Sequence, residues 1–212
     1  MNPVDTTLYL VTNSEGRSES AFLDIVAQAC EGGVTLVQLR EKELPGKGFY
    51  ELALKVKDIT DSFDVPLIIN DRVDVAQAVD AAGVHLGQLD LPVAAARLIL
   101  GPNKIIGTST KTLEQALAAV AAGADYLGVG AIFPTTTKVV TVITSVDTLT
   151  EITQKVKIPV VAIGGLNAGN MEILQGSGIS GISVVTAIMN SPNPKEAAKE
   201  LRRMVEQLTV DS

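Results

Sequence analysis

The residues of this chain with the clearest chemical potential form a short polar segment directly after an apolar one. The apolar run at residues 126–133 predicts a buried strand, and the segment beyond it contains Thr135, Thr136, Thr137 and Lys138. Three hydroxyl groups and one ammonium group at the carboxyl end of a strand offer phosphate oxygens several hydrogen-bond donors and a compact positive charge. A solvated threonine-rich loop is the simpler alternative, so the phosphate-binding interpretation depends on which residues surround this segment.

A second candidate anion site lies at the end of the strand predicted at residues 35–40. Gln38 and Arg40 are two positions apart, so both side chains can point to the same face, and Lys42 begins the loop. One amide and two cations can bind an anion or a polar ring. An ordinary surface turn is the alternative, although an arginine that faces an apolar interior requires a polar or charged partner.

Two acidic residues follow the next two predicted strands. Asp71 comes directly after the strand at 67–70, beside Asn70, and Asp90 lies on the loop beyond the strand at 84–86. Mg²⁺ in phosphate-handling sites is commonly held by one or two carboxylates, with water and phosphate oxygens as its other ligands. The pair of carboxylates therefore predicts a Mg²⁺ site, while capping of a helix is the alternative for Asp71.

Small and hydroxyl-bearing residues occupy the remaining strand ends. The sequence predicts a loop at residues 108–112 that contains Ser109, and the glycine pair ending at Gly165 would let backbone N–H groups approach a ligand. Val185 and Thr186 open a short helical turn after the last predicted strand. These last two loops together predict a phosphate cradle. A tight turn is the alternative for the glycine pair.

The elements that must position these residues alternate regularly along the chain. Short apolar segments predict eight strands, and the Ala-, Leu-, Glu- and Lys-rich segments between them have helical spacing. The predicted strands span residues 8–12, 35–40, 67–70, 84–86, 104–107, 126–130, 160–163 and 182–185. Eight βα units without linkers favour an α/β fold, a single compact (β/α)8 TIM barrel domain over residues 1–212, with a doubly wound open sheet as the alternative. Active sites of such barrels lie where the strands end, which is where the polar residues occur.

Composition agrees with a buried parallel sheet and argues against several classes of partner. Hydrophobic residues make up 46% of the chain but aromatic residues only 3%, so aliphatic side chains must fill the core. The net charge of −7 argues against binding to nucleic acid or to an anionic membrane surface. Neither a signal peptide nor an apolar run of membrane-spanning length occurs, so we expect a soluble cytoplasmic protein whose partners are small molecules. The oligomeric state is left open, a homo-oligomer included.

Two residues that often carry chemistry occur once each. Cys30 lies in a predicted helix, cannot form an intrachain disulfide, and is expected to be a small buried hydrophobic residue. His85 lies within a predicted strand, which favours a structural role or a fixed tautomer over general-base catalysis. The sequence leaves open whether His85 faces the site.

Taken together, these segments resemble the thiamine phosphate synthase family over essentially the whole chain. The matching segments are residues 8–12, 37–42, 68–72, 83–88 with Asp90, Gly107 with Ser109 and Thr110, 133–138 and 161–165. The resemblance implies a Mg²⁺-dependent transferase that condenses 4-amino-5-hydroxymethyl-2-methylpyrimidine diphosphate with a thiazole phosphate to give thiamine phosphate and pyrophosphate. It further implies a dissociative mechanism, in which pyrophosphate leaves before the thiazole nitrogen attacks.

The resemblance also implies a role for each candidate residue. The positions that hold the pyrimidine diphosphate are Gln38, Arg40, Lys42, Asn70, Ser109 and Lys138. Those expected to act in catalysis are Arg40, Lys42, Ser109 and Lys138, and the expected Mg²⁺ ligands are Asp71 and Asp90. The positions at the thiazole phosphate are Thr135, Thr137, Gly165, Val185 and Thr186, and the wider substrate-binding set adds Glu41 and Thr136.

The chain departs from the family pattern in three places. Lys111 stands where the family usually has His, and Thr186 stands where it more often has Ser. Residues 139–144 form an uncharged β-branched run where the family loop is usually polar, which predicts a mobile or differently folded loop. The rival functions are a thiazole tautomerase-like paralogue, which relies on a His near position 111, another barrel enzyme with one phosphorylated substrate, and a non-catalytic phosphate-binding barrel.

Overall fold

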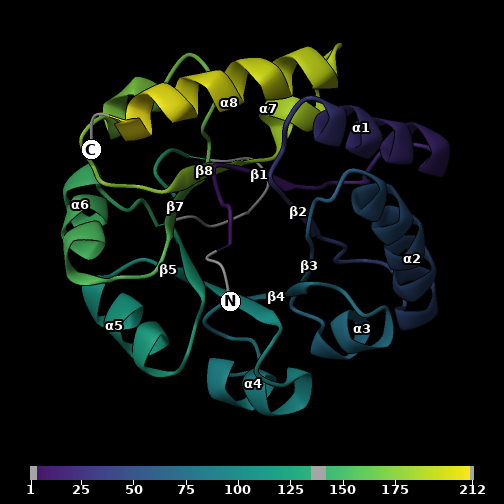
Figure 1. Cartoon of the computed structure of the whole chain (residues 1–212), viewed down its shortest axis with the longest axis horizontal. Helices are drawn as coiled ribbons and strands as arrows, with labels where there is room; N and C mark the ends of the chain where they lie inside the picture. The colour runs from purple at the N-terminus through teal and green to yellow at the C-terminus, as the bar shows by residue number, and fades with distance from the viewer. Residues whose placement is uncertain (1–3, 135–141, 211–212) are drawn as a thin grey trace.

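A closed barrel of eight parallel strands forms the centre of the molecule (Figure 1). The computed structural model describes residues 4–134 and 142–210. The strands are β1 (Leu8–Val11), β2 (Leu36–Leu39), β3 (Leu67–Asn70), β4 (Gly83–Leu86), β5 (Ile105–Thr110), β6 (Tyr126–Gly130), β7 (Val160–Ile163) and β8 (Gly181–Val184). Each strand pairs with its neighbours in chain order and β8 pairs with β1, so the expected TIM barrel is confirmed and the open sheet is excluded.

Helices form an outer ring around this barrel (Figure 1). They are α1 (Glu19–Glu31), α2 (Gly46–Ser62), α3 (Val73–Ala78), α4 (Val93–Leu100), α5 (Leu113–Ala121), α6 (Val146–Lys155), α7 (Thr186–Met189) and α8 (Pro194–Val210), with a 3₁₀ helix η1 (Met171–Leu174) after β7. Three of the helices are capped at their N-termini by a hydroxyl side chain, which accepts a hydrogen bond from a backbone N–H of the first turn. The capping residues are Ser18 for α1, Thr112 for α5 and Ser145 for α6.

One predicted strand boundary is wrong in a way that matters for the site. The sequence interpretation ended the fifth strand at residue 107 and assigned residues 108–112 to a loop, whereas β5 continues to Thr110. Its last residues pair with both neighbours, Thr108 with Leu86 of β4 and Ser109 with Gly128 of β6. Ser109 is therefore held by a sheet rather than by a loop, since β-branched threonines on either side of it suit a strand.

Because side chains alternate between the two faces of each strand, the barrel has two hydrophobic regions, one between the strands and the helices and one inside the barrel. In β1, Leu8 and Leu10 pack outward against the helices, whereas Tyr9 points into the barrel. The residues that fill the interior of the barrel are Tyr9, Leu36, Ile68, Tyr126 and Val161. Aliphatic side chains make up most of both regions, in agreement with the low aromatic content.

Cys30 is buried on the inner side of α1, as expected from the sequence, with a relative exposure of 6%. Burial raises the pKa of its thiol to about 12. Since the thiolate is the reactive form, we expect native protein to react with a thiol-specific disulfide reagent far more slowly than protein unfolded in guanidinium chloride. Equal rates of thiol release in the two conditions, followed by absorbance, would contradict this placement.

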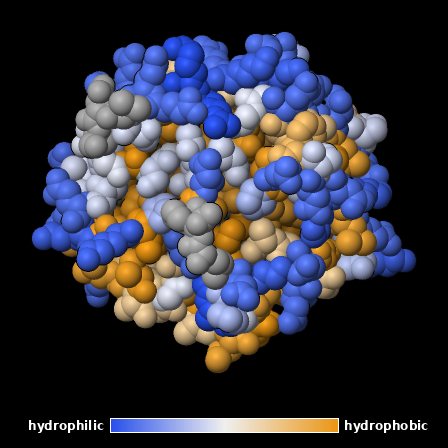
Figure 2. Space-filling view, viewed as in Figure 1, coloured by the Kyte–Doolittle hydropathy of each residue, from blue (hydrophilic) through white to orange (hydrophobic). Residues whose placement is uncertain are grey.

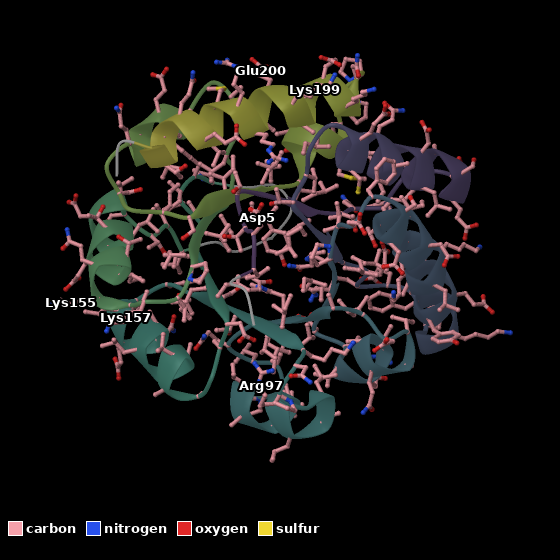
Figure 3. All side chains as sticks on the ribbon, viewed as in Figure 1. Asp5, Arg97, Lys155, Lys157, Lys199 and Glu200 are labelled. Atoms are coloured by element: carbon pink, nitrogen blue, oxygen red, sulfur yellow. The ribbon has the colours of Figure 1, made fainter. Side chains whose placement is uncertain are left out.

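The surface seen in Figure 2 mixes polar areas with several apolar ones. Hydrophilic side chains gather over α8, where Lys199 and Glu200 point outward, and hydrophobic ones gather over α4 (Figures 2 and 3). In α4, Leu98 is 87% exposed, while Arg97 lies on the inner side of the helix and donates to Asp125 at 2.6 Å. No helix within residues 4–134 and 142–210 is long and apolar enough to cross a bilayer.

Candidate active site at the carboxyl ends of the strands

A pocket of about 270 Å³ opens at the carboxyl ends of the strands. Ten of the residues expected at the site line this pocket: Gln38, Arg40, Lys42, Asn70, Asp71, Asp90, Ser109, Gly165, Val185 and Thr186. They come from strands on every side of the barrel, so closure of the sheet is what brings them together.

One wall of the pocket carries an acidic pair and a lysine. The Lys42 ammonium donates to Asp71 Oδ2, which links the loop after β2 to the end of β3. Asp90 reaches back from the loop after β4, where its Oδ2 accepts a hydrogen bond of 2.6 Å from the backbone N–H of Gly87. The predicted pair of carboxylates therefore lies side by side, with a cation next to it.

The two carboxyl groups have different proton affinities. Burial acts to raise the pKa of Asp71, but hydrogen bonds with Lys42 and Asp90 hold this pKa below its ordinary value. Burial and the adjacent Asp71 carboxylate raise the pKa of Asp90. Asp71 is thus the more strongly anionic partner.

Asp71 is held in a left-handed backbone conformation, with φ of 60°. Its backbone N–H donates to the carbonyl oxygen of His85 at 2.9 Å, and Arg72, not Asp71, precedes the first turn of α3. Asp tolerates this region better than most residues, but its occupation at the edge of a pocket is typical of functional positions. The helix-capping alternative for Asp71 is therefore wrong.

Side chains of five strands form a chain of hydrogen bonds at and beneath the base of the pocket. Gln38 Nε2 donates to the Tyr9 hydroxyl at 2.5 Å, and the hydroxyls of Tyr9 and Tyr126 are 2.7 Å apart. His85 Nδ1 is 3.0 Å from the Tyr126 hydroxyl, and His85 Nε2 is 2.9 Å from Ser109 Oγ. His85 faces the pocket, which settles the position that the sequence left open.

The opposite wall carries the three described residues that were expected at the thiazole phosphate. Gly165 follows β7, on the far side of the barrel from Asp71 at the end of β3, and has φ of 67°. Val185 and Thr186 stand at the start of the short helix α7. These residues line the pocket on the side where the sequence predicts a phosphate cradle, and their role in phosphate binding stays a prediction.

Some expected site residues are not among those that line the pocket. Glu41 does not line it: its Oε2 accepts a hydrogen bond of 2.7 Å from Ser14, and burial raises the pKa of this carboxyl group. Thr135, Thr136, Thr137 and Lys138 lie outside the described residues, and so do residues 139–141, the first half of the run at 139–144.

The structure adds pocket residues that sequence reasoning assigned no role. Tyr9 and Ser183 line the pocket, and so does Lys111, which the sequence had singled out only as a departure from the family. Side chains alternate between the two faces of a strand, so Tyr9 lies on the same face of β1 as Val11, two positions later, which also lines the pocket. This pattern could have identified Tyr9 from the sequence. Ser183 faces the pocket from β8 for the same reason.

The fold and the pocket define a class of protein, a TIM barrel with cations and carboxylates in a pocket at the carboxyl ends of its strands, which is where enzymes of this fold have their active sites. The family model described as "Thiamine monophosphate synthase" matches residues 8–188. The thiamine-phosphate synthase of Lacticaseibacillus paracasei is 53% identical over 202 residues, which is 95% of each chain. The chain belongs to the thiamine monophosphate synthase family, and it is an enzyme of thiamine biosynthesis, a transferase of the thiamine-phosphate diphosphorylase class.

Solved structures agree with this assignment. The thiamine phosphate pyrophosphorylase from Pyrococcus furiosus superposes with a TM-score of 0.89 at 40% identity, covering 97% of this chain and 98% of that one. A 3-hexulose-6-phosphate synthase superposes with a TM-score of 0.72 at 18% identity, covering 93% of this chain and 99% of that one. The second likeness shows the shared barrel fold alone.

Proposed function

We propose that this enzyme condenses 4-amino-5-hydroxymethyl-2-methylpyrimidine diphosphate with a thiazole phosphate in the presence of Mg²⁺. The bond between the methylene carbon and the diphosphate oxygen breaks first, and its electron pair leaves with pyrophosphate. The thiazole nitrogen then donates its lone pair to the pyrimidinylmethyl cation, which forms the new C–N bond of thiamine phosphate. No proton transfer and no protein nucleophile are needed for these two steps.

The observation that carries this proposal is that the residues expected to bind the two substrates lie on opposite sides of one pocket. Arg40, Lys42 and the Asp71–Asp90 pair lie on one side, and the backbone at Gly165 and Thr186 lies on the other. A wall with cations and carboxylates suits a metal-bound diphosphate, whereas a backbone cradle suits a monophosphate. One substrate with a single phosphate would leave one of these walls unused.

The carboxylate pair fits Mg²⁺ by the chemistry of its donors. Asp71 and Asp90 approach each other closely enough to share a hydrogen bond, with the proton on Asp90, and a bound cation could take the place of that proton between the two carboxylates. Within the described residues no set of three or more acidic, histidine or cysteine side chains forms a dedicated metal site, in keeping with an ion completed by water and substrate oxygens. When bound, Mg²⁺ would neutralise charge on the departing pyrophosphate.

The cations on the same wall have separate roles in this proposal. Lys42 already pairs with Asp71, so it orients that carboxylate and adds positive charge beside it. Arg40 is half-buried and has no ion pair within the described part of the chain, which leaves its planar donor group free for a phosphate. Charge that develops on the leaving group is stabilised by donors that are already in place.

The pyrimidine ring requires polar contacts nearer the barrel axis. Asn70 Nδ2 is buried without a hydrogen-bond partner among the described residues, and Asn70 lines the pocket. An unsatisfied buried amide is costly, so a ligand that accepts its hydrogen bond gains affinity there. Gln38 and Ser109 line the same region. The roles of Lys138 with the diphosphate, and of Thr135, Thr136 and Thr137 in the cradle, stay predictions from the resemblance.

Pyrophosphate release by the purified protein tests the proposal. We expect release only with both substrates and Mg²⁺, in step with the appearance of thiamine phosphate, and none when EDTA replaces the metal. Release of pyrophosphate without a thiazole substrate would contradict the coupled reaction. Tight binding of one substrate without turnover would instead support a non-catalytic barrel, and isomerisation of a thiazole substrate would support the tautomerase alternative.

Gly165 offers a test of the cradle. A Cβ at this position would lie 2.7 Å from Phe133 Cβ and 2.7 Å from the Pro134 carbonyl oxygen, and a positive φ disfavours any other residue. We expect Gly165→Ala to raise the KM for the thiazole phosphate roughly tenfold, given about 1–2 kcal/mol for the left-handed conformation. The KM for the pyrimidine diphosphate should change far less.

Gly176 is the matched control for this substitution. It also has a positive φ, of 73°, but a Cβ there would meet nothing within 4 Å, and it does not line the pocket. Gly176→Ala should therefore lower thermal stability while the KM values stay those of the unaltered enzyme. Equal KM changes in the two variants would remove Gly165 from the cradle.

A further inference from the structure

Strand register places one histidine and one tyrosine on either side of a glycine. His85 of β4 is level with Gly107 of β5, and Gly107 is level with Tyr126 of β6. A Cβ on Gly107 would lie 2.0 Å from Tyr126 Cζ and 2.4 Å from its hydroxyl oxygen. Because Gly107 has no side chain, the two rings meet across it, with His85 Nδ1 3.0 Å from the Tyr126 hydroxyl.

Tyr126 does not line the pocket, although its partners do. Its side chain is completely buried in the barrel, beneath Tyr9 and His85, whose rings it contacts at centroid distances of 5.7 and 5.6 Å. Tyr126 cannot contact a substrate from this position. Any effect of its hydroxyl on the reaction must pass through one of these neighbours.

The direction of the hydrogen bonds follows from the donor at one end. Gln38 Nε2 is a donor only, so the Tyr9 oxygen accepts from it and Tyr9 donates its own proton to Tyr126. The Tyr126 hydroxyl then donates to His85 Nδ1, which leaves the His85 proton on Nε2, directed at Ser109 Oγ. With the bonds reversed, the Tyr9 oxygen would accept from both neighbours and its own proton would lack an acceptor in this chain of contacts.

We propose that Tyr126 is a positioning residue that holds His85 as the Nε2–H tautomer, so that His85 donates to Ser109 and the Ser109 hydroxyl proton is directed into the pocket toward the pyrimidine diphosphate. The role of Ser109 in this statement rests on the proposed function, whereas the tautomer of His85 does not. Ser109 thereby acts as a hydrogen-bond donor to substrate rather than as an acceptor.

The surroundings of the two phenols agree with this arrangement. Burial is the main cause that raises the pKa of both Tyr9 and Tyr126 well above the ordinary value for tyrosine. Both hydroxyls therefore keep their protons and remain able to donate at neutral pH. Gly128 adds to the packing, since a Cβ there would lie 3.2 Å from His85 Cε1.

Nitrogen NMR of the imidazole tests the tautomer directly, because His85 is the only histidine. We would label histidine with ¹⁵N and record correlations between ring nitrogens and carbon-bound protons at a pH of about 8, where an ordinary imidazole is neutral. The proposal requires a protonated Nε2 and an unprotonated Nδ1 in the unaltered protein. An Nδ1–H tautomer would overturn it, whether or not the enzyme is active.

Substitution of each tyrosine separates positioning from packing. In Tyr126→Phe we expect a mixture of tautomers, because Nδ1 loses its donor, and roughly a tenfold lower kcat/KM for the pyrimidine diphosphate. Tyr9→Phe keeps the Tyr126–His85 contact but removes the proton donated to Tyr126, so the Tyr126 hydroxyl can then accept from Nδ1–H and a mixture of tautomers is expected here too. Tyr50→Phe, at an exposed position on α2, should change neither the spectrum nor the kinetics.

Two results would contradict the positioning role. A pure Nε2–H tautomer in folded Tyr126→Phe, with circular dichroism like that of the unaltered protein, would show that Ser109 alone sets the tautomer. Tautomer mixing in Tyr126→Phe with unchanged kcat/KM would show that the proton position does not matter to turnover. Inactivity of the unaltered enzyme with both substrates would instead count against the proposed function and leave the tautomer result intact.

Discussion

Replacement of Asp71 by alanine should abolish Mg²⁺-dependent pyrophosphate release, with a fall in kcat/KM on the order of a thousandfold. The estimate follows from several kcal/mol of charge stabilisation by a correctly held metal ion, at a factor of ten for each 1.36 kcal/mol. Asp71 is the critical member of the pair because Lys42 and Asp90 keep its pKa low, so it carries the negative charge that a cation requires. Its loss would also leave the Lys42 ammonium without its partner.

A Mg²⁺ titration separates loss of the metal site from general damage. In Asp71→Asn, which keeps the shape of the side chain, we expect residual activity only at much higher Mg²⁺ concentration. Asp74, on α3, is the matched control, since its exposed side chain pairs with Arg72 and does not line the pocket. Asp74→Asn should behave like the unaltered enzyme, and an unchanged Mg²⁺ requirement in Asp71→Ala would remove Asp71 from the metal site.

The overall fold could be predicted because each strand and each helix carries its own local signal. Four-residue apolar strands such as β3 and β7 were located to the residue, since runs such as LIIN and VVAI suit a sheet that is covered on both sides. The end of β5 was missed because Thr108, Ser109 and Thr110 are polar and were assigned to a loop. Threonine suits strands as well as turns, and pairing with β4 and β6 decides between them.

The candidate site could be predicted only in part, for a similar reason. Arg40 and Asp90 were identified from their positions near strand ends, which sequence alone reveals once a barrel is inferred. The contacts among site residues depend on register between strands, which sequence does not display. The meeting of His85 with Tyr126 requires Gly107 between them, and the pairing of Lys42 with Asp71 requires adjacent loops.

Substitution of Arg40 should lower the rate of the chemical step more than the affinity for substrate. We expect Arg40→Ala to reduce kcat by a factor of roughly 100–1,000, the range for removing one preorganised donor from developing negative charge. The KM for the pyrimidine diphosphate should rise less, because Lys42 and the carboxylate-bound metal would still attract the ground-state diphosphate. Arg203, exposed on α8 and 3.2 Å from Gln207 Oε1, provides a control that should leave both constants unchanged when replaced by alanine.

Arg40→Lys tests whether charge or geometry is the larger part of this effect. Lysine would keep the positive charge but lose the planar pair of donors that can bind two phosphate oxygens at once, so an intermediate kcat is expected. The backbone N–H of Arg40 donates to Thr12 Oγ1 at 3.2 Å, a bond that either substitution preserves, so the strand end should stay in place. If Arg40→Ala instead raised KM with kcat unchanged, the guanidinium would bind substrate and transition state equally, and stabilisation of the departing pyrophosphate would have to come from the other groups on that wall.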